Sequence, residues 1–334
     1  MITNVSYCHL FMVHSVGLYT NMEHRPTWLV YFLFADLQRV TSPCSECGNI
    51  CSRNFDSQEK GRFYPLLRKK VNCDNIMNRM AFCPFKIIRP PLRQPPQNLV
   101  KNFTMDGQCK TGTPWYMDNS ALLVPKRLNK TDFNSLLNRD KQGININNYH
   151  DRNTLKPALK RYLFAIKGKH VAVVGTEVPW AEAILLNLGA DRVTTVEYRE
   201  LTIEHPRVDV ITPFTFAEKF LNRIADTFDA VFSYSSIEHA GLGRYGDPLM
   251  PYGDMEALAQ IWCSTKPGGY LFLALPMTVN RKECVLQWNA LRWYGYVRMQ
   301  HLTANWKVFD EIKLFGPVSR FDFNHYLYIL QKLE

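Results

Sequence analysis

The chain lacks a long uninterrupted apolar stretch. Its best run, Trp28–Phe34, is far shorter than the roughly 20 residues that a membrane-spanning helix needs. The moderately apolar segment Cys8–Tyr19 has no basic residue before it and is interrupted by His14, so it makes a poor secretory signal. We therefore expect no membrane span. The cytoplasm and the lumen of the secretory pathway both stay open, and the features below favour the lumen.

Cysteine is scarce in the second half of the chain, where only Cys263 and Cys284 occur. The other seven of the nine precede residue 110: Cys8, Cys44, Cys47, Cys51, Cys73, Cys83 and Cys109. This distribution is typical of a disulfide- or metal-stapled module at the front. The spacing of Cys44, Cys47 and Cys51 is half of a zinc pattern, but a second C-x2-C pair is missing. Zinc, disulfides and free thiols are therefore all open for this region.

Acidic residues are scarce in the middle of the chain. Residues 51–169 carry 23 Lys and Arg against 8 Asp and Glu, whereas residues 170–334 carry 15 against 19. Such a basic segment indicates either a solvated surface or an anionic partner: nucleic acid, a membrane surface or an acidic glycan. No RNA- or DNA-binding motif accompanies it, which makes nucleic acid the weaker expectation. Three N-glycosylation sequons, at Asn4, Asn102 and Asn129, favour the secretory pathway.

Composition divides the chain into three regions. Residues 1–83 form a cysteine-rich region without clear periodicity. Residues 84–150 are basic and irregular, and they begin with five prolines between positions 84 and 97, which favours an extended linker or a wrapping segment. Residues 151–334 show the regular alternation of a folded domain.

That last region reads as a Rossmann-like α/β fold. Strands are expected at His170–Gly175, Arg192–Glu197, Val208–Ile211, Phe228–Tyr234 and Tyr270–Leu275, and helices at Thr154–Lys167, Pro179–Leu188, Thr215–Ile224 and Asp254–Thr265. Their alternation predicts a parallel sheet with helices on both faces. Two late strands, Trp306–Phe315 and Phe323–Gln331, are joined by a short loop and predict a closing antiparallel hairpin. This ending distinguishes a methyltransferase-type sheet from that of a plain dinucleotide dehydrogenase.

The loop after the first strand is poor in glycine. It keeps only Gly175, followed by Thr176 and Glu177. Ligands of open α/β sheets bind at the carboxyl ends of the strands, so we expect this loop to contact a nucleotide-like cofactor, with Glu177 at its ammonium group. The alternative is a nucleotide loop that has been lost. Glu197 ends the second strand, in the position of a residue that accepts both ribose hydroxyls, unless it is an exposed strand-end glutamate.

The densest group of polar and ionisable residues follows the fourth strand, between Ser233 and Asp247. Within it we expect His239 to act as a general base, with Glu238 or Asp247 orienting it or binding substrate. Ser235 and Ser236 are expected at the cofactor. The expected substrate-binding residues are Arg244, Tyr245, Asn289 and Arg292. The alternatives are a histidine that only shapes the loop, and packing or surface positions for Asn289 and Arg292. No metal ligands are assigned in this domain.

Four runs in the second half carry a family resemblance: GTEVPWAEAILLNLGADRVTTVEYRE, SSIEHAGLGRYGDPLMPYGDMEAL, KPGGYLFLALP and WNALRWYGYVR. They closely resemble the family called domain of unknown function 268, found in methyltransferase-like proteins. The resemblance implies the class I fold of S-adenosylmethionine-dependent methyltransferases and S-adenosylmethionine as cofactor. It also implies that a glycine-poor first loop belongs to the family. It supplies no substrate.

Two main functions follow. The first is methyl transfer from S-adenosylmethionine to an oxygen or nitrogen of a small molecule or glycan, in which positioning provides much of the rate. The second is a non-catalytic Rossmann-fold protein that binds a nucleotide or sugar, because a fold does not determine a function. Nucleic-acid modification is a third, weaker hypothesis that rests on the basic segment.

Overall fold

A computed structural model describes residues 71–82, 90–147, 152–314 and 323–333. All of them belong to one compact unit, Cys44–Glu334. The predictions for Asn4 and for Cys8, Cys44, Cys47, Cys51 and Cys83 lie outside the described residues, and so does the half zinc pattern. In the described ranges, every helix is too short or too polar to cross a membrane.

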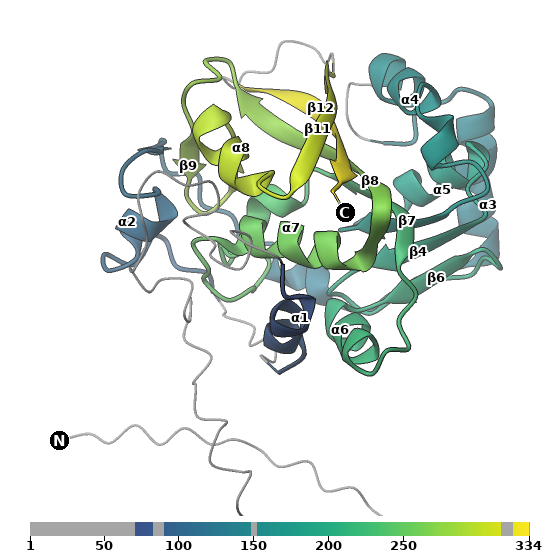
Figure 1. Cartoon of the computed structure of the whole chain (residues 1–334), viewed down its shortest axis with the longest axis horizontal. Helices are drawn as coiled ribbons and strands as arrows, with labels where there is room; N and C mark the ends of the chain where they lie inside the picture. Colours follow the sequence, from purple (N-terminus) through teal and green to yellow (C-terminus); the bar gives the residue numbers. More distant parts are fainter. Residues whose placement is uncertain (1–70, 83–89, 148–151, 315–322, 334) are drawn as a thin grey trace, which may run out of the picture. The chain divides into compact units, whose positions relative to one another are not determined.

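A seven-stranded mixed sheet forms the centre of the domain (Figure 1). Its strands are β3 (His170–Val174), β4 (Arg192–Val196), β6 (Val208–Ile211), β7 (Phe228–Tyr234), β8 (Thr265–Thr278), β11 (Trp306–Lys313) and β12 (Phe323–Lys332). Their order is β11-β12-β8-β7-β3-β4-β6. The first five strands along the chain run parallel, while β12 is antiparallel to both β8 and β11. The α/β fold expected from the sequence is confirmed, and all seven predicted strands are present.

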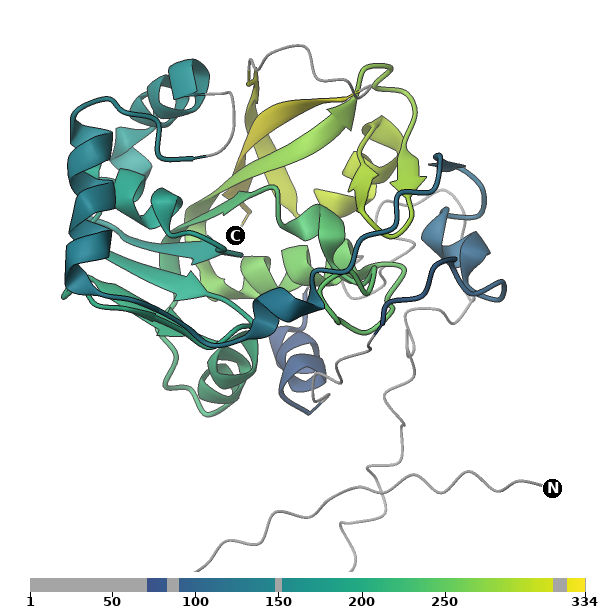
Figure 2. The same ribbon diagram turned by 180° about the vertical axis from the view of Figure 1, so that it is seen from behind.

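Helices cover both faces of this sheet (Figures 1 and 2). They are α1 (Cys73–Phe82), α3 (Lys130–Lys141), α4 (Arg152–Lys160), α5 (Trp180–Asn187), α6 (Pro213–Leu221), α7 (Gly253–Ser264) and α8 (Tyr296–Leu302), while the short α2 (Val100–Phe103) packs in a separate cluster. Neighbouring side chains of a strand point to opposite faces. In β3, Val171 and Val173 pack with α3, α4 and α5, whereas Ala172 packs with α1, α6 and α7. The domain therefore has two hydrophobic cores, one on each side of the sheet.

The helix predicted at Thr154–Lys167 is shorter in the structure. Helix α4 ends at Lys160, and a 3₁₀ turn follows at Leu163–Ala165. This turn places both Tyr162 and Ile166 in the core, and the Tyr162 hydroxyl donates to a carboxylate oxygen of Asp310 at 2.5 Å. Burial of these side chains therefore overrides the continuous helical spacing of the sequence.

The described residues before the α/β domain, 71–82 and 90–147, form a wrapping segment that lies against this domain. Strand β1 (Lys110–Thr111) pairs with β9 (Val285–Gln287), which also pairs with β10 (Leu291–Trp293). Strand β2 (Lys126–Leu128) pairs with β5 (Leu201–Ile203), and α3 packs against α5. Of the two expectations for this segment, the wrapping one fits and the free linker does not. Sequence patterns did not predict these strand pairings, because the pairing strands are only two or three residues long.

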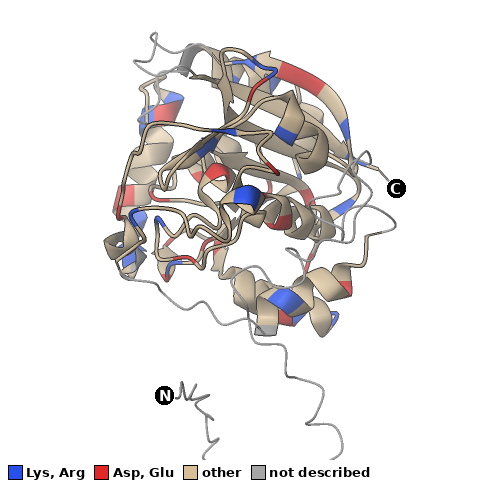
Figure 3. Cartoon of the chain, turned by 90° about the vertical axis from the view of Figure 1, so that its left-hand side faces the viewer, with Lys and Arg blue, Asp and Glu red and all other residues tan. Residues whose placement is uncertain are grey.

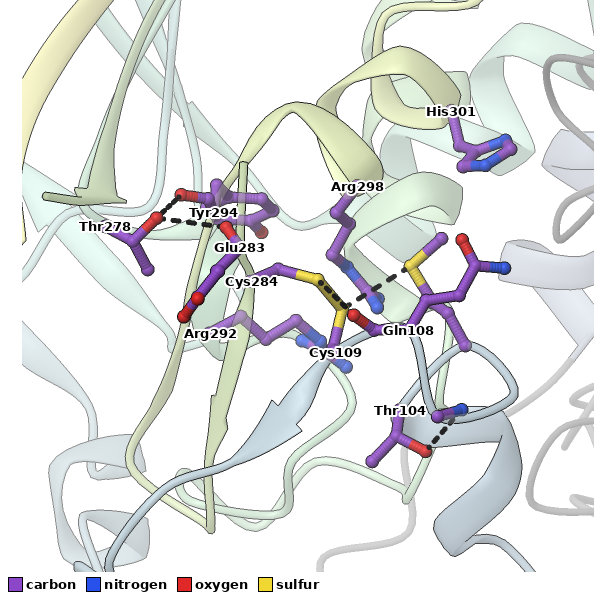
Figure 4. The surroundings of a disulfide bond; sticks show 12 residues. Thr104, Gln108, Cys109, Thr278, Glu283, Cys284, Arg292, Tyr294, Arg298 and His301 are labelled. Carbon is purple, nitrogen blue, oxygen red and sulfur yellow. Dashed lines mark hydrogen bonds between the residues drawn. A yellow bond between two sulfur atoms is a disulfide. The ribbon is translucent and has the colours of Figure 1, made fainter. Parts of the chain in front are cut away.

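Two disulfide bonds tie the early part of the chain to the α/β domain. Cys73 bonds to Cys263, and Cys109 bonds to Cys284 (Figure 4). Cysteines of the front region thus pair across 190 and 175 residues with the two late cysteines. For these four residues the disulfide alternative is correct, and both bonds join the early part of the chain to the α/β domain.

Charge pairing accounts for part of the basic excess. Cations from the middle of the chain contact carboxylates in five ion pairs, namely Arg79–Glu256, Lys110–Glu283, Arg127–Glu204, Lys156–Asp140 and Arg161–Asp310. Basic and acidic residues accordingly lie interspersed on the side shown in Figure 3. Four of the five carboxylates belong to the acidic domain, so part of the basic excess is paired within the protein, although pairs as exposed as Lys110–Glu283 and Arg127–Glu204 add little stability.

Candidate functional site

The predicted site residues lie at the carboxyl ends of the parallel strands. The loop after β3 begins at Gly175, the loop after β4 at Glu197, and the loop after β7 at Ser235. Because β3 lies between β4 and β7 in the sheet, these three loops meet at one edge. This is the position at which strand order reverses and at which open α/β sheets bind ligands.

Gly175 makes the turn after β3. Its φ of +80° is a conformation that side chains disfavour, and a Cβ added there would lie 2.0 Å from the hydroxyl oxygen of Ser236. Glycine is therefore required at this position on both counts. The close approach also shows that Gly175 and Ser236, both predicted at the cofactor, lie against each other.

Glu197 joins the β4 end to the β3 loop. Its Oε2 accepts a hydrogen bond from the backbone N–H of Thr176 at 2.7 Å. Its Oε1 accepts from the backbone N–H groups of Tyr198 at 2.8 Å and Arg199 at 3.2 Å. Burial raises the pKa of the carboxyl, although the three N–H groups oppose that shift. Two residues predicted to share a ligand, Thr176 and Glu197, are thus brought together.

Arg199 is a site residue that the sequence analysis missed. Its side chain is 6% exposed, and Nη2 donates to the carbonyl oxygens of Thr176 at 3.0 Å and Glu177 at 3.1 Å. The Lys126 ammonium donates to the same Glu177 carbonyl at 2.9 Å, while the Glu177 residue itself is exposed. These two cations fix the backbone of the β3 loop. The signal in the sequence was a basic residue two positions after the strand-end glutamate.

Glu182, on α5, lies beneath the same loop and is fully buried. Its Oε1 accepts hydrogen bonds from the hydroxyls of Thr176 at 2.8 Å and Thr195 at 2.7 Å. Its Oε2 has no hydrogen-bond partner among the described residues. Burial raises the pKa of this carboxyl to about 7, against the effect of the two hydroxyls.

The buried carboxyl of Glu182 should make the protein less stable as the pH rises. The unfolded state loses this proton near the ordinary glutamate pKa, whereas the folded state keeps it until about pH 7. We expect the free energy of unfolding to fall by about 2–3 kcal/mol between pH 4.5 and 7.5 from this group. Glu182→Gln keeps the oxygen that the hydroxyls use but cannot ionise, so denaturant titrations of this variant should lack that component. Exposed Glu218→Gln is the control and should behave as the wild type does. If the free energy of unfolding falls equally with rising pH in the wild type and in Glu182→Gln, the expectation is wrong.

The loop after β7 begins at a strained residue. Ser235 has a φ of +46°, a conformation that costs a non-glycine residue about 1–3 kcal/mol and that is concentrated at functional sites. Its hydroxyl donates to Oε1 of Glu238 at 2.5 Å. Glu238 is fully buried, which raises its pKa to about 7, and its Oε2 has no hydrogen-bond partner in the described part of the chain. A buried carboxyl oxygen without a partner, beside a strained serine, is typical of a ligand site.

His239 has the geometry of a base. Its Nδ1 lies 2.7 Å from the carbonyl oxygen of Ala290, which can only accept, so the proton of the neutral ring resides on Nδ1. The lone pair is therefore on Nε2, which lies 3.6 Å from Oε1 of Glu238. Burial, with the positive charge of Arg244, lowers the pKa of His239 to about 3. The ring is thus neutral at physiological pH, with the lone pair on Nε2, and it is a weak base in the unliganded protein.

His325 is a second histidine at this edge, and the sequence analysis did not assign it. It lies on β12, its ring stacks on Tyr234 with 5.5 Å between centroids, and its Nε2 lies 3.4 Å from the Ser235 hydroxyl oxygen. Burial lowers its pKa to about 4. Only the antiparallel return of β12 beside β8 brings it to this loop, so nothing local in the sequence could indicate it.

Two of the predicted substrate residues lie near His239. The Arg244 guanidinium donates to the Ala290 carbonyl at 3.1 Å and to the side-chain oxygen of Asn119 at 2.8 Å. The Tyr245 ring lies edge-on to the His239 ring, with 5.7 Å between centroids, and is half-buried. Arg244 and Tyr245 therefore stand where a substrate beside His239 would contact them.

Three other predicted site residues, Asp247, Asn289 and Arg292, bond mainly to backbone in this structure. Asp247 accepts three backbone N–H bonds of its own loop, from Gly241, Gly243 and Tyr245. Asn289 is fully buried and makes two 2.8 Å hydrogen bonds with the backbone of Met117. Arg292 is 2% exposed and donates to four carbonyl oxygens, those of Glu238, Ala240, Met250 and Pro251. Most of their polar atoms are bonded internally, although Nε of Arg292 has no hydrogen-bond partner among the described residues.

A hollow of about 360 Å³ lies beside this edge of the sheet. It is lined by residues of the β2–β5 pair, of the loop after β4 and of the end of β6: Pro125, Lys126, Arg127, Arg199, Glu200, Leu201, Thr202, Val210, Ile211 and Thr212. Its volume is in the range of small-molecule sites. Because Arg199 lies between this hollow and Glu197, the hollow adjoins the loops described above.

Comparison with solved structures finds similar proteins at low identity. The 1,6-didemethyltoxoflavin-N1-methyltransferase from Burkholderia thailandensis is 16% identical, with a TM-score of 0.37, over 62% of this chain and 92% of that one. The N-methyltransferase NodS from Bradyrhizobium japonicum is 13% identical, with a TM-score of 0.34, over 55% and 99%. A hemolysin-like protein of Streptococcus thermophilus is 13% identical, with a TM-score of 0.38, over 57% and 69%.

Sequence comparison gives one family. No curated protein matches the chain. Residues 168–320 match the family model described as "Caenorhabditis protein of unknown function, DUF268", a range that contains all the loops of the candidate site. The resemblance expected from the sequence is thereby confirmed: residues 168–320 match the DUF268 family model.

Proposed function

We propose that this protein is an S-adenosylmethionine-dependent methyltransferase of the class I fold. The observation that supports this most strongly is the sheet: five parallel strands, one antiparallel strand inserted before the edge, and Glu197 at the end of the second strand bonded to the loop after the first. Ligands of such sheets bind at the point where the strand order reverses, which here is at the carboxyl ends of the neighbouring strands β3 and β7.

The residues at this edge fit a nucleoside with a cationic tail. Gly175 makes the turn without a Cβ, and Glu197 brings a carboxylate to the place where ribose hydroxyls are accepted. The partnerless oxygen of Glu238 and the exposed Glu177 suit a positive charge. When bound, the cofactor supplies an electrophilic methyl group on a sulfonium.

The chain itself positions the acceptor and takes up its proton. Nε2 of His239 carries the lone pair, and it takes the proton of a hydroxyl acceptor as the methyl is transferred if the bound ligands raise the low pKa that the ring has in the unliganded protein. The Ala290 carbonyl keeps the ring in this tautomer. Arg244 and Tyr245 line the acceptor side of the ring, which suits a hydroxyl-bearing glycan or small molecule.

Calorimetric titration with S-adenosylmethionine and S-adenosylhomocysteine tests this proposal. Wild-type protein should bind both ligands, and Glu197→Ala should bind them about 10–100-fold more weakly, because a charged group that accepts hydrogen bonds from the ligand is lost. Exposed Glu218→Ala, on α6, removes a carboxylate without touching the site and should bind as the wild type does. Absence of binding by protein with both disulfides intact would overturn the assignment.

A second candidate is a non-catalytic nucleotide-binding protein, and one observation favours it. Lys126, Arg127 and Arg199 line the hollow beside the site, and although each already binds a carbonyl or carboxylate oxygen, their positive charge suits a phosphate group. Adenosine diphosphate titrated into the same protein separates the two. Binding of the diphosphate without binding of S-adenosylhomocysteine would establish this second function in place of the first.

A further inference from the structure

We infer that Asn129 is an N-glycosylation site and that this chain folds in an oxidising, glycosylating compartment. The inference rests on the disulfides and on the surroundings of two sequons, and it is independent of the proposed function.

The cysteines point to an oxidising compartment. All four cysteines in the described ranges form disulfides, and each bond joins the wrapping segment to the α/β domain. Structural disulfides form and persist in secreted and luminal proteins, whereas cytosolic thiols are kept reduced. A chain held together in this way passes through the compartment in which asparagine sequons are modified.

The sequon at Asn102 cannot carry a glycan in the folded protein. Asn102 and Thr104 are 8% and 6% exposed, and the Thr104 hydroxyl donates to the Val100 carbonyl at 2.8 Å (Figure 4 shows Thr104 near the Cys109–Cys284 bond). The neighbouring Phe103 is packed in a hydrophobic cluster with Trp288, at 5.1 Å between ring centroids. A glycan on Asn102 would therefore have to displace this cluster, so the folded protein carries none there.

The sequon at Asn129 has the opposite surroundings. Asn129 and Thr131 are both exposed, at the start of α3. Asn129 caps this helix, and its Oδ1 accepts a hydrogen bond from the backbone N–H of Asp132 at 2.9 Å. The cap uses the oxygen of the amide and leaves the nitrogen, which is the atom that a glycan modifies.

The modification is compatible with the cap. A bond forms between Nδ2 of Asn129 and the anomeric carbon of a polyprenyl-diphosphate-linked oligosaccharide, and the bond from that carbon to the diphosphate oxygen breaks. The diphosphate leaves with the electron pair, and one amide proton is released to the transferring enzyme. Oδ1 stays a carbonyl oxygen, so it still accepts from Asp132 and the start of α3 is kept.

The test is site-specific mapping of the full chain, isolated from its native source and also produced behind a cleavable secretory leader in animal cells. Deglycosylation with peptide N-glycosidase in heavy-oxygen water labels each modified asparagine as aspartate. We expect the label at position 129 and not at 102. Thr131→Ala removes the sequon but keeps the Asn129 cap, so it should abolish the label, and Thr131→Ser should restore it.

Thr104→Ala is the matched control in the other sequon and should leave the label at 129 unchanged. Protein retained in the cells is mapped in the same way as secreted protein. An unlabelled position 129 in protein from either preparation would overturn the inference, and so would a label at position 102 in folded protein.

Discussion

The Asp254→Asn variant is expected to lose about 3–5 kcal/mol of stability, because it leaves two buried guanidinium groups without their counter-charge. Asp254 is fully buried on α7 and accepts two 2.7 Å hydrogen bonds from Arg298 and one of 3.0 Å from the Tyr294 hydroxyl. Arg292 lies 4.0 Å from the same carboxylate. Removing one partner of a buried ion pair costs far more than the pair contributes in net terms.

This effect should depend on pH in a defined direction. Burial alone would raise the pKa of Asp254, but the charges of Arg298 and Arg292 lower it to about 2. A carboxyl whose folded-state pKa is depressed stabilises the protein above the ordinary aspartate pKa, and this stability is lost as the pH falls from about 4 to 2. The difference between the wild type and Asp254→Asn should therefore be largest near neutral pH and shrink below pH 4.

Urea unfolding between pH 2.5 and 7 measures this difference. Exposed Asp191→Asn is the matched control and should unfold as the wild type does. Because Arg292 also donates to the carbonyls of Glu238 and Ala240, the variant should loosen the loop that carries His239, which amide hydrogen exchange would detect. A loss below about 1 kcal/mol at neutral pH would show that this cluster is not a buried ion-pair network of the kind described.

The regular part of the fold could be predicted from the sequence because its signals are local. Short β-branched runs such as His170–Val174 and a strand-end residue such as Glu197 lie where their patterns indicate. The wrapping segment could not, since strands β1 and β2 are too short for periodicity and pair with residues far along the chain. Local patterns carry no information about such distant pairing.

The residues of the candidate site also fall into those whose role local sequence predicts and those whose role it does not. Gly175, Ser235 and His239 follow strands directly and could be named from position alone. Arg292 and Asn289 have the residue types of ligand-binding groups, yet the structure uses them to hold backbone, and only burial distinguishes the two roles. The sequence shows which side chains can donate or accept hydrogen bonds. It does not show whether backbone groups of the folded protein already occupy those donors and acceptors.

The last prediction concerns the disulfides, which close the longest loops in the described structure. Cys73–Cys263 and Cys109–Cys284 overlap along the chain, so each bond crosses the loop that the other closes. Replacing either pair by alanine should cost about 2–5 kcal/mol, because the unfolded chain regains the freedom that a long closed loop removes. In the folded protein, Cys109–Cys284 lies beside Arg292 and Arg298 (Figure 4), so its loss should also loosen the Asp254 cluster.

Loss of the two disulfides should expose different parts of the chain to proteolytic cleavage. Without Cys73–Cys263, α1 is still held by the ion pairs Arg79–Glu256 and Arg223–Asp74, so limited proteolysis should cleave near it only slightly faster. Without Cys109–Cys284, the exposed strand β1 is held by its short pairing with β9 and by the exposed Lys110–Glu283 ion pair, so cleavage around Lys110 should rise more steeply. Thermal unfolding of both double variants, with and without reductant, provides the measurement. If full reduction leaves the unfolding temperature of the wild type unchanged, neither bond has a structural role. The variant that lacks all four cysteines is the control, and reductant should not change the unfolding temperature of the described part of its chain.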